Sequence, residues 1–330
     1  MIRIGILGAA KIAPKAILEP ARKRTDCRVV AVAARDVDRA TAFAAEHGIQ
    51  HVADSYDALI ARDDIDLIYN ALPPHRHADL SIAALKTGKA VLCEKPFAMN
   101  ADEAGNMAEA ARRADRPLIE AFHYRFHPAF ERVLNIVRSG HIGDIVSMES
   151  DFSVSIPYRP GELRHTLETG GGALMDLGCY SIHMLRTVAG TEPGVASAQC
   201  HCDRPGVDIS THARLNFGGD VSGAVMTSMS ETVTRRILLH VEGSHGSVTF
   251  TNPVHPHRGH EIIVQRYGQT TTETVPGEVT YDHQLAHVID VLAGRAKPLT
   301  GGADAVANMQ VIDAIYRAAG LSPRPSMAAS

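Results

Sequence analysis

Five short apolar runs in the first 122 residues constrain the fold of this chain more than any other feature. The runs are almost continuous rather than alternating, which is typical of strands buried on both faces of a sheet. Amphipathic stretches that favour helices separate them, so the order of elements predicts a parallel, doubly wound sheet of the α/β class with right-handed crossovers. The expected strands are 2–7, 29–33, 67–71, 90–93 and 118–121, and the expected helices are 14–23, 37–46, 77–86 and 101–113. Pro20 is expected to kink or end the first helix.

The pattern changes near Arg125, after which apolar and polar residues begin to alternate. Alternation is typical of antiparallel strands with one buried and one exposed face. We therefore expect a second, α+β domain, 123–303, with a large, mainly antiparallel sheet whose open face is left for a partner. The expected strands are 145–154, 211–217, 223–230, 236–242, 247–250 and 261–267, and the expected helices are 128–138, 284–292 and 304–318. Helix 304–318 is expected to return to the first domain, 1–122, and the residues after Leu321 are expected to be disordered.

The composition excludes several classes of protein. The chain has 330 residues, enough for two domains, and its formal net charge of −4 leaves no basic excess to meet the phosphates of a nucleic acid. Five cysteines at irregular spacing predict unpaired thiols in a reducing compartment. No stretch reaches the length of a membrane span, and the apolar N-terminus fits a first strand better than a signal peptide. We therefore expect a cytoplasmic protein without a nucleic-acid or membrane partner.

A small-residue turn after the first apolar run points to a dinucleotide. Gly8, Ala10 and Ala13 occupy the three positions at which a dinucleotide-binding loop needs small residues between a strand and a helix. Alanine replaces glycine at the second position, where the backbone approaches the pyrophosphate, and a tight turn without a ligand is the alternative. If the loop binds a cofactor, the contacts are expected at Gly8, Ala9, Ala10, Lys11 and Ile12.

The end of the second apolar run bears on which cofactor would bind. An NAD site usually has an acidic residue there, which accepts from the ribose 2′-hydroxyl, whereas arginine suits the 2′-phosphate of NADP. Ala34 and Arg35 end the run, and Arg39 follows one turn into the expected helix. Asp36 is either the acceptor for the ribose or the N-cap of that helix. We favour the cap, and therefore NADP over NAD, with Ala34, Arg35 and Arg39 in the binding site.

Two further motifs suggest hydride chemistry. Lys95 follows a buried run, where a charge is costly unless something uses it, and Pro96 restricts Lys95 to extended geometry. Asp176 and Tyr180 have the i, i+4 spacing that places two side chains on one face of a helix, although an acidic first turn with a packed tyrosine is the alternative. Oxidation of a carbinol needs a base for the hydroxyl proton, and a lysine cation near Tyr180 would make that phenol acidic enough. Asp176 could then orient the substrate or hold the lysine.

Four segments give the chain a resemblance to a known family. They are Gly-Ala-Ala-Lys-Ile-Ala at 8–13, Ala-Leu-Pro-Pro-His-Arg-His at 71–77, Gly-Lys-Ala-Val-Leu-Cys-Glu-Lys-Pro at 88–96, and Gly-Gly-Ala-Leu-Met-Asp-Leu-Gly-Cys-Tyr at 171–180. Together with Asp304 and the helix that includes 309–316, they make most of the chain similar to the family of glucose-fructose oxidoreductase, inositol dehydrogenase and the rhizopine-catabolism proteins. The resemblance implies a dinucleotide-binding Rossmann domain over 1–122 and a substrate and oligomerisation domain over 123–303.

Tyr180 narrows the resemblance to one branch. Many members have histidine there, whereas tyrosine, with Glu-Ala-Phe-His-Tyr-Arg-Phe-His-Pro at 120–128, is similar to the dimeric dihydrodiol dehydrogenases and NADP-linked D-xylose dehydrogenases. This resemblance implies NADP-dependent hydride transfer with an aldopyranose or a cyclic trans-diol, and places Lys95 and Tyr180 in catalysis. The implied cofactor contacts are Leu72, His75, His77, Glu94, Lys95 and Arg125.

The resemblance also implies an open sheet face that pairs subunits into a homodimer or homotetramer. Alternation places small and apolar side chains on that face, at Ala224, Met226, Ser228 and Ser230. Two alternatives to a dehydrogenase stay open: a cofactor-binding sensor without turnover, and glycoside cleavage through a transient oxidation with retained cofactor.

The remaining motifs carry less weight. Tyr158 and Arg164 precede the triple glycine and are candidates for substrate contact or parts of a solvated loop. No metal site is expected, because no histidine or cysteine cluster has a complete ligand set with characteristic spacing. The clusters are 255/257/260, 123/127 and 200–202.

Overall fold

The computed structural model describes residues 1–326, and residues 327–330 lie outside the described part. The chain divides into two compact units. The first consists of Met1–Phe122 and Tyr281–Val306, and the second consists of His123–Thr280 and the chain from Ala307 onward.

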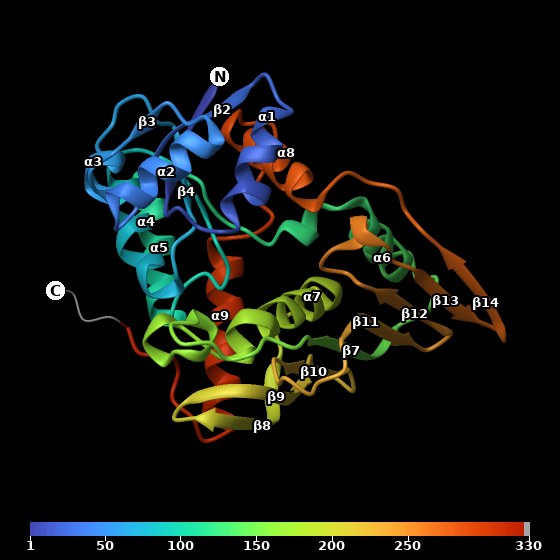
Figure 1. Ribbon diagram of the computed structural model, residues 1–330. Coiled ribbons are helices and arrows are strands. Elements are labelled where there is room, and N and C mark those ends of the chain that lie inside the picture. Colours follow the sequence, from blue (N-terminus) through green and yellow to red (C-terminus); the bar gives the residue numbers. More distant parts are fainter. Residues whose placement is uncertain (327–330) are drawn as a thin grey trace. The chain divides into compact units, whose positions relative to one another are not determined.

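The first unit is built on a six-stranded sheet whose strands are all parallel (Figure 1). In spatial order the sheet reads β3-β2-β1-β4-β5-β6. The strands are β1 (Ile2–Leu7), β2 (Cys27–Ala33), β3 (His51–Val52), β4 (Leu67–Asn70), β5 (Ala90–Cys93) and β6 (Leu118–Glu120). The parallel sheet that the continuous apolar runs predicted is confirmed. Its additional strand, β3, has only two residues, too few to form an apolar run.

Helices surround this sheet (Figure 1). They are α1 (Glu19–Arg22), α2 (Val37–His47), α3 (Tyr56–Ile60), α4 (His77–Lys86), α5 (Ala101–Ala114) and α8 (Thr280–Leu292). A π-helical turn, Pro14–Leu18, precedes α1. Pro20 lies in the first turn of α1, which continues directly from that π-helical turn. The irregularity expected at Pro20 is therefore a change from π-helical to α-helical geometry just before it.

The second unit contains an eight-stranded sheet in the order β14-β13-β12-β11-β7-β10-β9-β8. Its strands are β7 (Ile145–Ser153), β8 (Gly194–Arg204), β9 (Val207–Asn216), β10 (Ser222–Ser228), β11 (Arg236–Gly243), β12 (Gly246–Thr251), β13 (Ile262–Arg266) and β14 (Gln269–Glu273). The pair β7–β10 is parallel and the other pairs are antiparallel, which confirms a mainly antiparallel sheet. The two strands absent from the sequence prediction, β8 and β14, are the edges of the sheet, and their polar sequences lack the apolar alternation that marked the others.

One face of this sheet is covered by helices (Figure 1). Helix α7 (Cys179–Ala189) packs on β7 and β10, and α6 (Pro128–Arg138) packs on β12. In β10, Val225 and Thr227 are buried whereas Ala224 and Met226 are partly exposed, as the predicted alternation requires. Ser228, predicted on the same open face, is buried, and Ser230 lies beyond the end of the strand. A groove on the sheet, lined by residues of β7–β10 and by Ala318 and Ala319, has a volume of about 720 Å³.

Helix α9 (Ala303–Ala318), which was expected to return to the first unit, is divided between the units, and only Ala303–Val306 groups with the first. From Ala307 onward it groups with the second unit, where Asn308 Nδ2 donates to the Cys179 carbonyl and Asn308 Oδ1 accepts from Arg186, at 3.2 Å in both cases. Helix α8 instead returns to the first unit, and Lys23 and Asp282 form an ion pair of 2.6 Å there. Helical periodicity identified both helices but carries no information about which sheet a helix covers.

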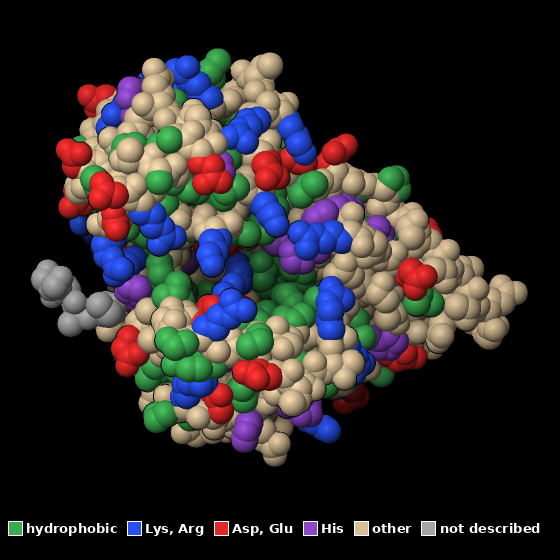
Figure 2. Space-filling view, viewed as in Figure 1, with side chains coloured by type: hydrophobic (Ala, Val, Ile, Leu, Met, Phe, Trp, Pro, Cys, Tyr) green, Lys and Arg blue, Asp and Glu red, His purple; other side chains and the backbone are tan. Residues whose placement is uncertain are grey.

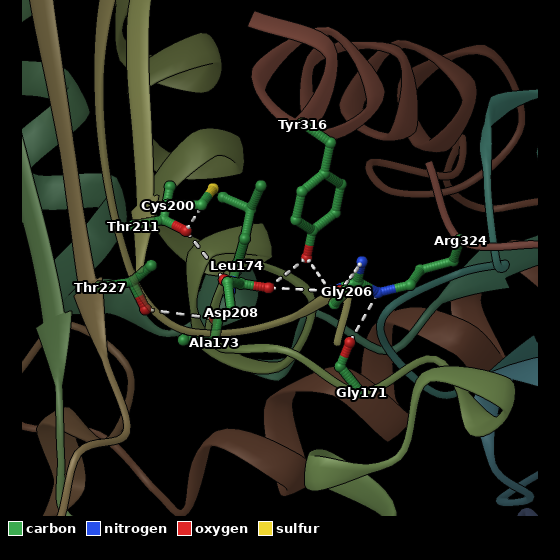
Figure 3. Close-up of polar contacts among 10 residues, drawn as sticks. All are labelled: Gly171, Ala173, Leu174, Cys200, Gly206, Asp208, Thr211, Thr227, Tyr316 and Arg324. Carbon is green, nitrogen blue, oxygen red and sulfur yellow. Dashed lines mark hydrogen bonds and ion pairs between the residues drawn. The ribbon is translucent and has the colours of Figure 1, made fainter. Parts of the chain in front are cut away.

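A buried ion pair ties the end of the described chain to the second unit (Figure 3). Arg324 Nη2 lies 2.8 Å from Asp208 Oδ1, and both side chains are fully buried. The same guanidinium donates to the carbonyl oxygens of Gly171 and Gly206 at 2.7 and 2.8 Å. The Tyr316 hydroxyl donates to Asp208 Oδ1 at 2.8 Å and accepts from Arg324 at 2.7 Å.

The second carboxylate oxygen of Asp208 organises the glycine turn before α7. It accepts from Leu174 N and from the Thr211 hydroxyl, each at 2.8 Å. A Cβ atom at Gly172, whose φ is +129°, would lie 2.2 Å from Asp208 Oδ1, so only glycine fits this position. The disorder expected after Leu321 is therefore wrong for residues 322–326, while residues 327–330 lie outside the described part.

Three further features bear on the composition-based expectations. None of the five cysteines, all of which lie in the described part of the chain, forms a disulfide. No helix in the described part of the chain is long and apolar enough to cross a membrane. On the face shown in Figure 2, acidic and basic side chains are interspersed with neutral ones.

Candidate active site

The expected cofactor loop lies at the carboxyl end of β1, next to the point where the strand order of the first sheet reverses. Ligands of open α/β sheets bind at this position. Gly8 has a φ of +98°, and a Cβ atom there would lie 3.0 Å from Leu72 Cδ2. The loop therefore needs glycine for its turn and for its close approach to the loop after β4. Leu72, which the resemblance placed at the cofactor, is thus a neighbour of the glycine turn.

The backbone of this loop is suited to an anion. Within residues 1–326, the N–H groups of residues 9–12 have no acceptor in the chain. Backbone N–H groups between a strand and a helix form a natural phosphate site. Ala9 is buried, Ala10 and Ile12 are partly buried, and Lys11 is exposed.

Two arginines follow β2, and one of them, Arg39, contacts the loop. Arg39 Nη2 donates to the Ala9 carbonyl oxygen at 2.7 Å, and Arg35 is exposed just after β2 and the buried Ala34. Asp36 accepts from the backbone N–H groups of Asp38 and Arg39 at 3.0 and 3.1 Å, which confirms that it is the N-cap of α2. Because the Asp36 carboxylate caps α2, Arg35 and Arg39 are the charged groups near the end of β2 that suit a phosphate.

The histidines of the loop after β4 differ in their surroundings. His77 is fully buried, with Nε2 2.7 Å from the Leu72 oxygen and Nδ1 3.0 Å from the Pro96 oxygen. Burial lowers the pKa of His77 to about 4 even though these carbonyl contacts act in the opposite direction. His77 therefore links the loop after β4 to the loop after β5. Because its side chain is fully buried, the cofactor contact predicted for His77 would be made by these two loops.

His75 has a different position, at the surface end of the same loop. It is partly exposed, and its buried Nδ1 atom has no hydrogen-bond partner among the described residues. Burial lowers the pKa of His75 below its ordinary value. An unsatisfied ring nitrogen in the loop whose Leu72 lies beside Gly8 fits a residue that contacts a bound ligand.

Glu94 and Lys95 follow β5 at the same edge of the first sheet. The Tyr69 hydroxyl donates to Glu94 Oε1 at 2.7 Å, and the Lys95 backbone N–H donates to Glu94 Oε2 at 3.3 Å. Burial, followed by the charge of Glu94, raises the pKa of Tyr69 well above its ordinary value, so Tyr69 is a neutral donor that orients this carboxylate. The peptide bond between Lys95 and Pro96 is cis.

Tyr180, in the second unit, is a nearly buried phenol surrounded by aromatic rings. It is 5% exposed, and the rings of Phe152 and Tyr124 lie 5.6 and 5.9 Å from its own. Its hydroxyl lies 3.3 Å from His123 Nε2, and His123 Nδ1 lies 2.8 Å from the Thr280 hydroxyl. The phenol oxygen therefore has an imidazole as its neighbour within the second unit.

Asp176 does not share a regular helix with Tyr180 as expected. It lies in a π-helical turn, Leu174–Gly178, and α7 begins only at Cys179. Arg164 Nε donates to Asp176 Oδ2 at 2.7 Å, and the charge of Asp176 raises the pKa of Arg164. Asp176 and Arg164, predicted separately as an orienting group and a substrate contact, thus form an ion pair.

Two other predicted site residues take local partners. Tyr158 is 47% exposed, and the Arg204 guanidinium stacks 3.8 Å from its ring centre. Arg125 Nη1 lies 3.5 Å from Glu131 Oε2, and the Arg125 guanidinium lies over the Phe130 ring, 5.6 Å from its centre. Substrate contact by Tyr158 and cofactor contact by Arg125 stay predictions.

The contacts of His123 were not predicted from the sequence, where this residue was part of the segment 120–128 and half of a discounted metal pair. Its partners in the fold, Tyr180 and Thr280, are 57 and 157 positions away, so no local spacing could reveal them. Among the described residues, no group of three or more His, Cys, Asp or Glu side chains could hold a metal ion.

Comparison with known proteins connects both units to one family. Residues 2–122 match the model of the GFO/IDH/MocA oxidoreductase family with an NAD-binding Rossmann fold, and residues 130–249 match the model of the GFO/IDH/MocA C-terminal domain. A D-xylose 1-dehydrogenase (NADP(+)) of Haloferax volcanii is 33% identical over 318 residues, which cover 96% of each chain.

Two further similarities are informative. A trans-1,2-dihydrobenzene-1,2-diol dehydrogenase of Xenopus tropicalis is 34% identical over 231 residues, 69% of each chain. A crystal structure of a 3-ketoreductase from Actinomadura kijaniata, in complex with NADP and TDP-benzene, aligns with a TM-score of 0.88 and 26% identity. That alignment covers 96% of this chain and 97% of the ketoreductase.

Proposed function

We propose that this chain, which belongs to the GFO/IDH/MocA family of oxidoreductases, is an NADP-dependent dehydrogenase that transfers a hydride between the nicotinamide and a ring carbinol of an aldopyranose or cyclic trans-diol. The observation that carries the proposal is the buried Tyr180 hydroxyl next to the His123 imidazole, because a carbinol dehydrogenase needs a positioned acid/base group. Two relatives, named as a D-xylose dehydrogenase and a dihydrodiol dehydrogenase, support this substrate class.

NADP is the proposed cofactor, and its nicotinamide would supply the hydride acceptor. The loop after β1 would hold the pyrophosphate through the N–H groups of residues 9–12. Arg35 and Arg39 would bind the 2′-phosphate, since Asp36 is engaged as the cap of α2. The names of the Haloferax relative and of the ketoreductase complex, both of which include NADP, support this assignment.

In the proposed mechanism, Tyr180 removes the carbinol proton and Lys95 makes it able to do so. A free phenol titrates near pH 10, so little phenolate exists at neutral pH. A lysine cation that acts in the same reaction stabilises the phenolate and polarises the substrate oxygen. Glu94, held by Tyr69, would keep the start of the Lys95 segment in place.

The direct test is a screen of aldoses and cyclic trans-diols with NADP and with NAD, which follows the absorbance of the reduced cofactor. We expect turnover of one member of these classes with NADP preferred. If every candidate stays unreactive with either cofactor while NADP binds, the dehydrogenase proposal fails and a cofactor-binding sensor replaces it.

Arg35 provides a test of cofactor choice. Arg35→Ala is expected to weaken NADP binding roughly 10- to 150-fold and NAD binding far less, because the charged hydrogen bond to the extra phosphate is lost. Binding of both reduced cofactors can be followed by their fluorescence. Arg28→Ala is the matched control, since Arg28 is an exposed arginine at the other end of the same strand. Equal losses for both cofactors would show that Arg35 does not read the phosphate.

The proposed assembly is a homodimer or homotetramer that pairs through the open sheet face. The partly exposed Ala224 and Met226 belong to that face, opposite the side that α7 covers. Light scattering at micromolar concentration is expected to give the mass of two or four chains, and Met226→Lys is expected to lower it. A monomer mass for the unmodified protein would contradict this assembly.

A further inference from the structure

The contacts of Tyr180 extend beyond the phenol, into a chain of polar groups within the second unit. The Tyr180 hydroxyl lies 3.3 Å from His123 Nε2, and the opposite ring nitrogen, Nδ1, lies 2.8 Å from the Thr280 hydroxyl. His123 is 2% exposed and Thr280 is fully buried, so bulk water does not solvate the imidazole in this structure. We propose that His123 is the second proton acceptor of the reaction, which takes the proton that Tyr180 receives from the substrate.

The hydrogen bond to Thr280 suits the tautomer of His123 that can accept a proton from Tyr180. When Nδ1 carries the proton and donates to the Thr280 hydroxyl, Nε2 has a lone pair directed at Tyr180. Thr280 is itself held in place, because it is the first residue of α8 and its N–H donates to His257 Nδ1 at 3.4 Å. After a proton reaches Nε2, the Nδ1–H bond to Thr280 persists and stabilises the imidazolium.

This proton transfer rests on the proposed function and accompanies oxidation of the substrate. The carbinol C–H bond breaks and its hydride leaves, with both electrons, to the oxidised nicotinamide. The carbinol O–H bond breaks and its proton forms a new O–H bond on the Tyr180 oxygen. The new Tyr180 O–H bond then breaks and the same proton forms an N–H bond on His123 Nε2, which restores the phenolate, and the imidazolium releases the proton when the product leaves.

Other titratable groups surround His123, and they define the control. The His255 ring centre lies 5.2 Å away, and His257 lies 6.0 Å beyond His255. The neighbouring phenol, Tyr124, hydrogen-bonds to His183 Nδ1, which gives a second buried tyrosine–histidine pair in the same unit. His183 is 1% exposed and therefore matches His123 in burial.

A purely structural role for His123 is the competing interpretation, in which the imidazole only fixes the Tyr180 ring. Glutamine separates the two roles, because its amide can occupy the Nε2 position and bond to Tyr180 but cannot take up a proton. We expect His123→Gln to bind NADPH normally and to lose roughly 10²-fold in kcat. His183→Gln, the matched control, is expected to keep kcat within about threefold of the unmodified enzyme.

Chemical rescue sharpens the test. His123→Ala leaves a space for added imidazole, and the restored rate is expected to rise with the basicity of a series of substituted imidazoles. A His123→Gln enzyme with near-normal kcat overturns the proposal. A cofactor-binding His123→Ala enzyme that no imidazole rescues overturns it as well.

A measurement without substrate separates this proposal from the proposed function. Nitrogen NMR of labelled histidine is expected to show a protonated Nδ1 and an unprotonated Nε2 at His123, with the Nε2 signal displaced in Tyr180→Phe. A protonated Nε2 in the resting enzyme, or a signal that ignores Tyr180→Phe, rules out proton uptake from Tyr180. If the NMR result is as expected but no carbinol is oxidised, the dehydrogenase assignment is the part that fails.

Discussion

Tyr180→Phe is expected to lower turnover by roughly 10²–10⁴-fold while leaving the affinity for NADP nearly unchanged. The substitution keeps the ring that packs between Phe152 and Tyr124 and deletes only the oxygen next to His123. Steady-state kinetics with the substrate from the screen, together with cofactor fluorescence, measure the two quantities. Tyr124→Phe is the matched control, since it removes the hydroxyl of a neighbouring buried tyrosine that pairs with His183.

Lys95→Ala is expected to lower turnover too and to shift the basic limb of the pH–rate profile of the residual activity, because the cation that favours the phenolate is lost. The competing base is Asp176. Its carboxylate has an ion-pair partner of its own, Arg164 at 2.7 Å, which favours an orienting role. Near-normal turnover in Tyr180→Phe, combined with loss of activity in Asp176→Asn, would reverse the two roles.

Arg324→Met is expected to lower the free energy of unfolding of the second unit by about 3–5 kcal/mol, because breaking a buried ion pair leaves an uncompensated charge. Asp208 would keep its burial and lose a partner at 2.8 Å, and the carbonyl oxygens of Gly171 and Gly206 would lose their donors. Urea unfolding followed by circular dichroism measures the loss. Arg324→Lys should recover part of it, since the charge is kept but the fork of donors is not.

The control for this prediction is Arg295→Met. Arg295 pairs with Asp290 at 2.6 Å, but the two side chains are 58% and 45% exposed. A solvated pair of this kind contributes about 0–1 kcal/mol, so this variant should unfold almost as the unmodified protein does. Equal, small losses of unfolding free energy for Arg324→Met and Arg295→Met would mean that Asp208 does not need Arg324 as a partner.

The sequence predicted features that depend on local pattern. Continuous apolar runs located the longer strands of the first sheet, and the cap role of Asp36 followed from its place before a helix. Features that depend on distant partners were not predictable. His123 and Tyr180 are 57 positions apart, and Asp208 and Arg324 are 116 apart, so neither pair leaves a periodic or spaced motif.

The edge strands of the second sheet and the packing of the last helix were not predictable from local pattern either. Edge strands need only one backbone neighbour and little apolar surface, so the polar β8 and β14 carried no strand signal. The periodicity of α9 identified a helix, but its partner was decided by Asn308 and Tyr316, whose bonds to the second unit depend on the complete fold.

The division of the chain has a consequence for its biosynthesis. Domains usually fold as units in the order in which the ribosome makes them, the N-terminal one first. Here the first unit lacks residues 281–306 until the whole eight-stranded sheet of the second unit has been translated, and the Thr300 hydroxyl, which donates to the Glu120 carbonyl at 2.7 Å, belongs to that late segment. The second unit in turn lacks the arginine that neutralises Asp208 until residue 324 is added. Both units are therefore completed only by residues 281–324, and a nascent chain that stalls before this stretch contains neither unit in full.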